Sequence, residues 1–175
     1  TAQDGVQQQL VEWLDGIKDT WFPMGESIMK AMFDNTVAVP RCLDNCRPTH
    51  IANPVSGYRL EFDRLYYSHG VAFEFQGIQH RRRTDLHKSD EEFENAQMRD
   101  LVKIGLSSRH NIEVVEITAA DLRIDKIVTK IPARLPLLRI DAGEFVHRLD
   151  RIGQEYVFWY KRSQARKMKP DGGRA

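Results

Sequence analysis

Two neighbouring segments of β-strand character constrain the fold more than any other feature of the sequence. Residues 58–67 alternate apolar and polar side chains, and residues 71–76 form a second strand-like run. The tight turn Ser68-His69-Gly70 joins them, so the pattern predicts a β-hairpin. In such a hairpin, Asp63 on the first strand and Glu74 on the second can approach each other.

The segments around the hairpin predict an α/β fold. Ser89 and Glu92 form a capping box that opens a long helix to about His110, and residues 112–117 have the composition of a strand. Strands before and after that helix suggest a right-handed crossover between parallel strands. The remaining expectations are helices over 6–21, 25–34, 122–131 and 142–167, a short strand over 36–39 and a loop over 41–57.

Composition indicates an ordinary soluble protein. The chain has 175 residues, a formal net charge of +1, 41% hydrophobic residues and two cysteines, which excludes a disulfide framework. No apolar run approaches the roughly 18 residues of a membrane helix, and no signal-peptide pattern is present, so we expect a cytoplasmic protein. The start at Thr1 suggests processing or excision from a longer chain. The net charge argues against a uniformly basic nucleic-acid binder, but cations are concentrated in His80–Arg83 and after Tyr160.

The carboxylate pair is the first candidate site. Two carboxylates held close together raise each other's pKa unless a cation lies between them. Proteins bind Mg²⁺ through one or two carboxylates, and waters and a phosphate oxygen complete its shell. Asp63 and Glu74 are therefore a candidate metal site, and the alternative is a pair of exposed strand positions. The polar residues Gln76, Gln79 and His80 behind Glu74 favour the metal site.

Several motifs follow one another in an order typical of one enzyme group. They are Phe62-Asp63, the run Phe73-Glu74-Phe75-Gln76-Gly77-Ile78-Gln79-His80, the segment from His87-Lys88-Ser89 to Phe93, the helical stretch Met98-Arg99-Asp100-Leu101-Val102-Lys103 and the strand 111–117, with Gly25-Glu26 upstream. Together they resemble the PD-(D/E)XK nuclease superfamily, and within it the Vsr-like endonucleases of phages and mobile elements. The resemblance covers about residues 24–120, and the order of several motifs makes it more specific than any single motif.

The resemblance implies a fold, a reaction and a metal. The expected fold is a restriction-endonuclease-like α/β core, a mixed central sheet flanked by helices, over residues 24–120. A helical extension (1–23) would precede the core, and a second one with a basic tail (121–175) would follow it. The expected function is that of a DNA endonuclease that hydrolyses phosphodiester bonds with Mg²⁺ or Mn²⁺. Asp63 and Glu74 would bind the metal, and Glu26 would add a ligand or a contact behind it.

The same resemblance implies partners and a location. The expected partner is DNA, together with a second copy of the chain or a larger complex, and no membrane is involved. The protein is expected in the cytoplasm of a bacterium or as a phage-encoded protein.

One position departs from the superfamily pattern. Many members place a lysine two residues after the acidic ligand, where this chain has Gln76. Glutamine can orient a water or contact the phosphate, but it has no charge and cannot act as a general base. His80 is therefore expected to handle the proton, with Gln79 as a phosphate contact or as its hydrogen-bond partner. The alternative for His80 is a phosphate-binding or exposed histidine.

Cations near these motifs are the expected DNA contacts: Arg81, Arg82, Arg83, Lys88, Arg99 and Lys103. The arginine run follows the catalytic strand directly, where it would hold the DNA backbone beside the metal. Charge runs of this kind are also commonly solvated loops. Arg99 and Lys103 lie one helical turn apart, and pairing with Asp100 on the helix surface explains them equally well.

A second cluster consists of Cys42, Cys46 and His50, which have side chains that can bind Zn²⁺. Three ligands are one short of a closed tetrahedral site, and the spacing is wider than in common zinc motifs. A loop with two free thiols is therefore the preferred interpretation.

Two other functions fit the same residues. The absence of lysine at position 76 allows a non-catalytic DNA-binding or assembly subunit that has a nuclease-like fold. The additional helices at both ends allow a nuclease subunit of a larger transposition or restriction complex.

Overall fold

A four-stranded sheet with helices on both faces forms the described part of the protein. The structure is a computed structural model that describes residues 24–54, 56–77, 90–139 and 143–167. In chain order its elements are α2 (Met24–Asp34), β1 (Leu43–Cys46), β2 (Phe62–Tyr66), β3 (Val71–Gln76), α3 (Asp90–Arg109), β4 (Glu113–Thr118), α4 (Ile124–Ile127) and α5 (Glu144–Lys167), with 3₁₀ turns at Tyr67–His69, Ala119–Asp121 and Val128–Lys130. No helix in these ranges is long and apolar enough to cross a membrane.

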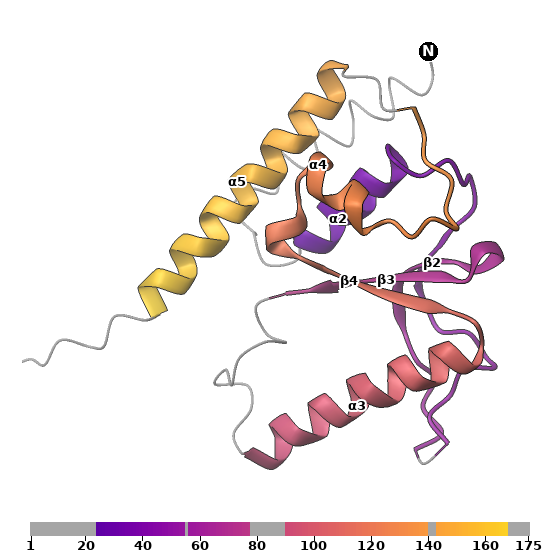
Figure 1. Cartoon of the computed structure of the whole chain (residues 1–175). Helices are drawn as coiled ribbons and strands as arrows, with labels where there is room; N and C mark the ends of the chain where they lie inside the picture. The colour runs from indigo at the N-terminus through magenta and orange to yellow at the C-terminus, as the bar shows by residue number, and fades with distance from the viewer. Residues whose placement is uncertain (1–23, 55, 78–89, 140–142, 168–175) are drawn as a thin grey trace, which may run out of the picture.

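The strands form one mixed sheet in the order β1-β2-β3-β4 (Figure 1). β2 is antiparallel to both β1 and β3, and Gly70, at a left-handed φ of 60°, closes the turn between β2 and β3. β4 returns parallel to β3 after α3, in a register that pairs Val71 with Glu113 and Glu74 with Glu116. The predicted hairpin and the predicted parallel pairing across the long helix are both confirmed.

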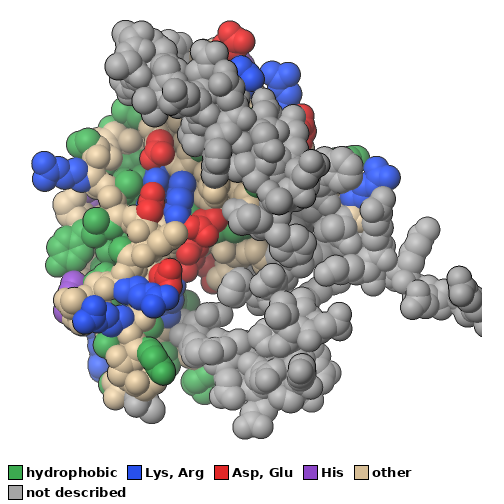
Figure 2. Space-filling view, turned by 180° about the vertical axis from the view of Figure 1, so that it is seen from behind, with side chains coloured by type: hydrophobic (Ala, Val, Ile, Leu, Met, Phe, Trp, Pro, Cys, Tyr) green, Lys and Arg blue, Asp and Glu red, His purple; other side chains and the backbone are tan. Residues whose placement is uncertain are grey.

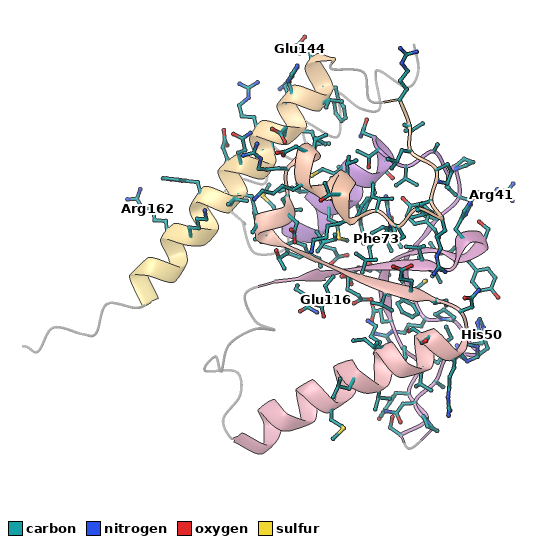
Figure 3. The ribbon with its side chains drawn as sticks, viewed as in Figure 1. Arg41, His50, Phe73, Glu116, Glu144 and Arg162 are labelled. Carbon is teal, nitrogen blue, oxygen red and sulfur yellow. The ribbon has the colours of Figure 1, made fainter. Side chains whose placement is uncertain are left out.

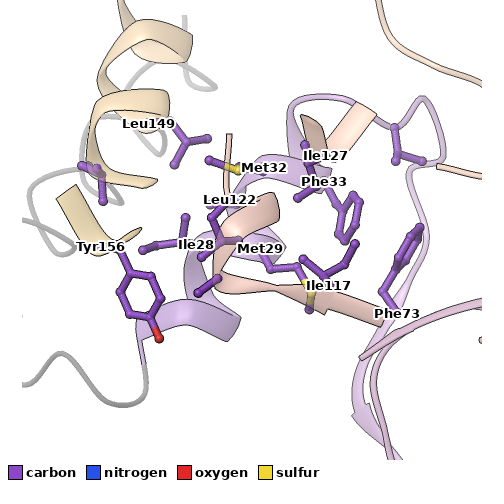
Figure 4. Close-up of a cluster of buried hydrophobic side chains, with 14 of the residues drawn as sticks. Ile28, Met29, Met32, Phe33, Phe73, Ile117, Leu122, Ile127, Leu149 and Tyr156 are labelled. Atoms are coloured by element: carbon purple, nitrogen blue, oxygen red, sulfur yellow. The ribbon is translucent and has the colours of Figure 1, made fainter. Parts of the chain in front are cut away.

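Helices cover both faces of the sheet. α2, α4 and α5 lie on one face, and α3 lies on the other (Figure 1). The larger core fills the α2 face and unites residues of α2, such as Phe33, with Phe73 of β3, Ile117 of β4 and Tyr156 of α5 (Figure 4). A smaller cluster packs toward α3 and includes Ala72, the neighbour of Phe73. Successive side chains of a strand point to opposite faces, so β3 supplies both cores.

The predicted α/β class is confirmed, and the errors concern short elements. The expected loop 41–57 contains β1, and the expected strand 36–39 forms only the single bridge Val37–Leu137, since Pro40 has no N–H for a longer ladder. The expected helix 122–131 is only the turn α4 and the 3₁₀ turn after it. α4 begins at Ile124, whose backbone N–H donates a 2.8 Å hydrogen bond to Asp150 Oδ1. The predicted helix 6–21 lies outside the described residues.

A buried arginine on β2 ties β1, the strand that the sequence did not predict, to the rest of the sheet. Arg64 is only 3% exposed, and its Nε and Nη2 donate to the two carboxylate oxygens of Asp44 on β1 at 2.8 and 3.0 Å. Its Nη1 donates to Asp34 at 2.6 Å and to the carbonyl oxygen of Lys30 at 2.9 Å, both on α2. Arg64 therefore ties β1 and α2 to the same strand that bears Asp63.

Gly153 sets how closely α5 lies against the core. A Cβ at this position would lie 2.2 Å from the carbonyl oxygen of Leu122 and 2.8 Å from Cε of Met32. Gly153→Ala is expected to destabilise the protein by about 1–3 kcal/mol, because the Leu122 carbonyl can move only with its backbone. Gly105→Ala on α3 is the control, since nothing lies within 4 Å of its Cβ and helix propensity favours alanine by about 1 kcal/mol. Urea denaturation measures both, and an unchanged midpoint for the Gly153 variant would contradict the close packing.

Candidate active site

A pocket of about 300 Å³ opens where β2 begins and β3 ends. Five of its described lining residues are carboxylates: Glu26, Glu61, Asp63, Glu74 and Glu116. The amine of Lys103 lines it as well. α2 contributes Glu26, the sheet contributes Asp63, Glu74 and Glu116, and α3 contributes Lys103. Such an excess of negative charge in one pocket favours the binding of a cation.

Asp63 and Glu74 lie on neighbouring strands, opposite each other. The cross-strand pair nearest to them is Arg64 with Phe73; Asp63 precedes Arg64 by one residue and Glu74 follows Phe73 by one. The Asp63 side chain also bonds to the next strand directly, since its Oδ2 accepts a 2.7 Å hydrogen bond from the N–H of Phe75. The structure thus brings the two carboxylates together, as the hairpin predicts.

Both carboxylates are held in surroundings that disfavour their charged form. Burial raises the pKa of Asp63, the Phe75 N–H opposes the rise, and the charge of Glu26 adds to it. Burial raises the pKa of Glu74 to about 7, although the ammonium of Lys103 lowers it, and the charge of Asp63 raises it further. A divalent cation at this pocket would oppose both shifts, because an adjacent positive charge favours the charged carboxylate.

Lys103 is the cation that the structure places against Glu74. Its Nζ lies 2.7 Å from Glu74 Oε1 and 5.1 Å from the centre of the Phe62 ring, and the side chain is 20% exposed. Glu74 Oε1 is buried and has no hydrogen-bond partner, so the contact with Lys103 is an ion pair without hydrogen-bond geometry. The sequence predicted Lys103 as a phosphate contact, whereas the structure places it against the central carboxylate.

Glu26 and Gln76 lie at the edge of the same pocket. Glu26, in the first turn of α2, forms an ion pair with Lys30, whose Nζ also donates to Asn45 Oδ1 at 2.6 Å. Gln76 Nε2 donates to Glu116 Oε1 at 3.4 Å. Both residues therefore lie where the sequence placed them, close to the carboxylate pair.

Sequence reasoning missed two of the pocket carboxylates. Glu116 is on β4 and pairs with Glu74 in the parallel ladder. Its side chain lies on the face of the sheet that α3 covers (Figure 3). Glu61 precedes β2, and Arg47 Nε donates to its Oε2 at 2.9 Å. The strand of Glu116 was predicted, but only the parallel register brings Glu116 to Glu74.

Several predicted site residues cannot be placed. Gln79, His80, Arg81, Arg82, Arg83 and Lys88 lie outside the described residues. Arg99 belongs to α3, one turn before Lys103, and its side chain is also outside the described part. Their roles remain predictions.

The structure does not gather Cys42, Cys46 and His50 into a site. Cys42 packs against the core on the α2 face, whereas Cys46 packs against the cluster on the α3 face. The His50 ring lies instead 5.1 Å from that of His110 and 5.9 Å from that of Tyr67, near the C-terminal end of α3 (Figure 3). Burial raises the pKa of both thiols. These observations favour the interpretation as two free thiols.

The carboxylates suit a hard divalent cation that shares its shell with substrate. Among the described residues, no three acidic, thiol or imidazole side chains are grouped so that together they could hold a metal ion. Mg²⁺ does not need one, since it binds through one or two carboxylates and keeps waters and phosphate oxygens as its other ligands. Glu74 Oε1, which is buried and accepts no hydrogen bond, and the nearby carboxylate of Asp63 could supply these one or two ligands.

One viral protein is similar to part of the chain. The uncharacterized protein 033L of Invertebrate iridescent virus 3 is 29% identical over 94 residues, which are 53% of this chain and 47% of the viral protein. The chain therefore spans about half the length of the curated relative that it matches. No model of a known protein family matches the chain, and no solved structure does.

Proposed function

We propose that the protein is a metal-dependent DNA endonuclease that hydrolyses phosphodiester bonds. The observation that carries this proposal is the pocket in which Asp63 and Glu74, on adjacent strands, lie beside Lys103 of α3. Two carboxylates suit Mg²⁺ or Mn²⁺, and a lysine suits a phosphate bound to the same ion. A nuclease needs both kinds of charge, because its substrate is anionic and its metal is cationic.

The order of elements supports the same proposal. A helix, three antiparallel strands, a long helix and a strand parallel to the third follow one another, which agrees with the order that the PD-(D/E)XK resemblance implies. Asp63 lies on the second strand and Glu74 on the third, as the motifs require. A restriction-endonuclease-like core is part of this proposal.

Lys103 answers the main objection to catalysis. Gln76 occupies the position at which many members of the superfamily have lysine, and this motivated the alternative of a non-catalytic subunit. In this protein α3 brings a lysine to the same carboxylate from another element. The pocket therefore contains the positive charge that position 76 does not supply.

Each residue of the pocket has a distinct task in the proposed reaction. Asp63 and Glu74 would hold the metal, with Glu26 beside them. The bound metal would polarise the phosphoryl oxygen and lower the pKa of the attacking water. Lys103 would offset the negative charge that gathers on the phosphate, and the Gln76 amide would orient a water by hydrogen bonding. His80 is the proposed proton carrier.

The proposal is tested by incubating the chain with supercoiled plasmid DNA and Mg²⁺ or Mn²⁺. Nicked or linear DNA is expected with the wild type, and none with EDTA or with the double variant Asp63→Asn/Glu74→Gln. Calorimetric titration with Mn²⁺ examines the metal site without reference to activity, and circular dichroism confirms that the variant is folded. A wild type that binds DNA but cleaves no supercoiled, single-stranded or mismatched substrate would instead support the non-catalytic subunit.

A further inference from the structure

The long helix α5 is divided into two halves of different charge. Its first half, residues 144–156, carries three acids and two arginines. Its second half, residues 157–167, carries four cations, Lys161, Arg162, Arg166 and Lys167, and no acid. Lys161 and Arg162 are exposed, and Phe158 is 58% exposed. We call residues 157–167 the basic arm.

The first half of α5 belongs to the core. Leu149, Ile152 and Tyr156 are buried there, and Asp150 bonds to the N-terminus of α4. Among the side chains of α5 that the structure describes, Tyr156 is the last buried apolar one, and Val157 is partly buried against the same core. In Figure 1 the yellow half of α5 continues past the sheet, and Figure 3 places Arg162 on this part.

The basic arm begins directly behind the candidate active site. Tyr156, the last buried residue before the arm, has its ring centre 6.3 Å from that of Phe75. Phe75 lines the pocket, and its N–H binds Asp63. From there the arm extends over 11 residues, or about 16 Å at the rise of an α-helix. It therefore reaches from the site outward, as a contact to a long substrate must.

We propose that the basic arm binds the phosphate backbone of duplex DNA next to the scissile bond. The inference rests on the proposed function, since it takes DNA as the substrate, and it adds a contact surface and the duplex form. The pocket itself is rich in carboxylates, and on the face shown in Figure 2 acidic and basic side chains are interspersed. DNA affinity must therefore come largely from cations outside the pocket, and the arm supplies four within a segment whose sequence contains no acid.

The shape of the arm favours a duplex. An α-helix has a diameter of about 10–12 Å, and the major groove of B-DNA is about 12 Å wide with phosphates along both walls. At about 3.6 residues per turn, the cationic positions 161, 162, 166 and 167 of this helix do not fall in a single stripe, which suits a groove with phosphates on both walls. Phosphate contacts of this kind position the DNA and carry no sequence information.

The test compares two fourfold variants of the full chain. The arm variant is Lys161→Ala/Arg162→Ala/Arg166→Ala/Lys167→Ala. The control removes four exposed arginines away from the arm: Arg41, Arg59, Arg109 and Arg139, each replaced by alanine. Binding to a short labelled DNA duplex is measured by anisotropy in Ca²⁺ between about 50 and 200 mM salt, and a gel checks that the duplex remains intact.

The arm variant is expected to bind at least about tenfold more weakly, with a salt dependence shallower by about 2–4 in the slope of log K against log salt. The control is expected to change affinity less than about twofold. Equal losses in the two variants, or no loss in the arm variant, would overturn the role of the arm even if the wild type cleaves DNA. Tighter binding to a single strand than to the duplex would overturn the duplex assignment. Arm-dependent binding without metal-dependent cleavage would leave the arm established and refute the nuclease proposal.

Discussion

Glu74→Gln is expected to lower metal-dependent cleavage about 10²–10³-fold and, at pH 8, to make the protein more stable. The loss of activity follows from the proposed role of Glu74, since a charged metal ligand contributes several kcal/mol to the stability of the transition state. The gain in stability follows from the same carboxylate, because the fold holds it in surroundings that disfavour its charge. Glutamine resembles the protonated acid and avoids that cost.

The sign of the stability effect follows from linkage. The pKa of Glu74 is 4.5 in an ordinary setting, and burial raises it to about 7 in the folded protein. Between these values the Glu74 carboxyl binds more protons in the folded state than in the unfolded state. Its contribution to stability is therefore most favourable below pH 4.5 and is lost as the pH rises through 7. At pH 8 the cost is at most about 3 kcal/mol, at roughly 1.4 kcal/mol per unit of pKa. At pH 5 the advantage of glutamine should fall below about 1 kcal/mol.

Thermal unfolding at pH 5 and pH 8 measures this difference. A gain of 1–3 kcal/mol corresponds to a rise in Tm of roughly 2–4 °C per kcal/mol for a chain of this size. Glu116→Gln, an exposed carboxylate of the same pocket, is the matched control and should change Tm little. Mg²⁺ should raise the Tm of the wild type at pH 8 more than that of Glu74→Gln. A Glu74→Gln protein that is less stable than the wild type at pH 8 would contradict the conclusion that burial disfavours the charged form of Glu74.

Lys103→Met is expected to reduce cleavage about 100-fold and to shift its pH dependence toward higher pH. Lys103 lowers the pKa of Glu74, so its loss raises that pKa further above 7, and the ligand ionises only at higher pH. The variant should also lose about 1–2 kcal/mol of stability at pH 8, since it leaves a half-buried carboxylate without its cation. Toward pH 5 this loss should fade, because Glu74 is then protonated in both proteins.

Lys103→Arg is the conservative comparison, since it keeps the charge and should retain the wild-type pH profile in part. Lys126→Met, an exposed lysine of α4, controls for the removal of a positive charge. The measurement is the rate of plasmid cleavage from pH 6 to pH 9 at a subsaturating concentration of Mg²⁺, at which metal binding depends on the ionisation of Glu74. If the profile of Lys103→Met coincides with that of the wild type, Lys103 does not act on Glu74 during the reaction.

The sequence predicted those parts of the fold in which local pattern and tertiary packing agree. β3 has the predicted bounds, 71–76, because its apolar run is bounded by Gly70 and Gly77 and packs on both faces. β1 was missed because its residues are exposed: Leu43 is 53% exposed, and Asn45 adopts a left-handed φ of 47°. What holds β1 in the sheet is its pairing with β2 and the contact of Asp44 with Arg64, and no local pattern reveals either.

The same reasoning explains how much of the site could be predicted. Asp63 and Glu74 follow from the hairpin, since the turn fixes which residues face each other. The pairing of Lys103 with Glu74 depends on the distance between α3 and the sheet. The contact of Glu116 with Gln76 depends on the register of β4, a strand 40 residues further along the chain. Contacts across a crossover connection leave no periodic signal, so the sequence placed Lys103 near the DNA but not against the carboxylate.

The shared core on the α2 face also limits how this protein can be divided. The segment 24–120 carries the motifs on which the resemblance rests. Leu122, Ile127, Leu149 and Tyr156 lie beyond it, yet they fill the same interior as Phe33 and Phe73. A recombination event or an engineered fusion that exchanged the chain after residue 120 would therefore replace one wall of the core and the support behind Phe75. The smallest heritable unit that keeps Asp63 in place therefore extends at least to Tyr156, the residue directly before the basic arm.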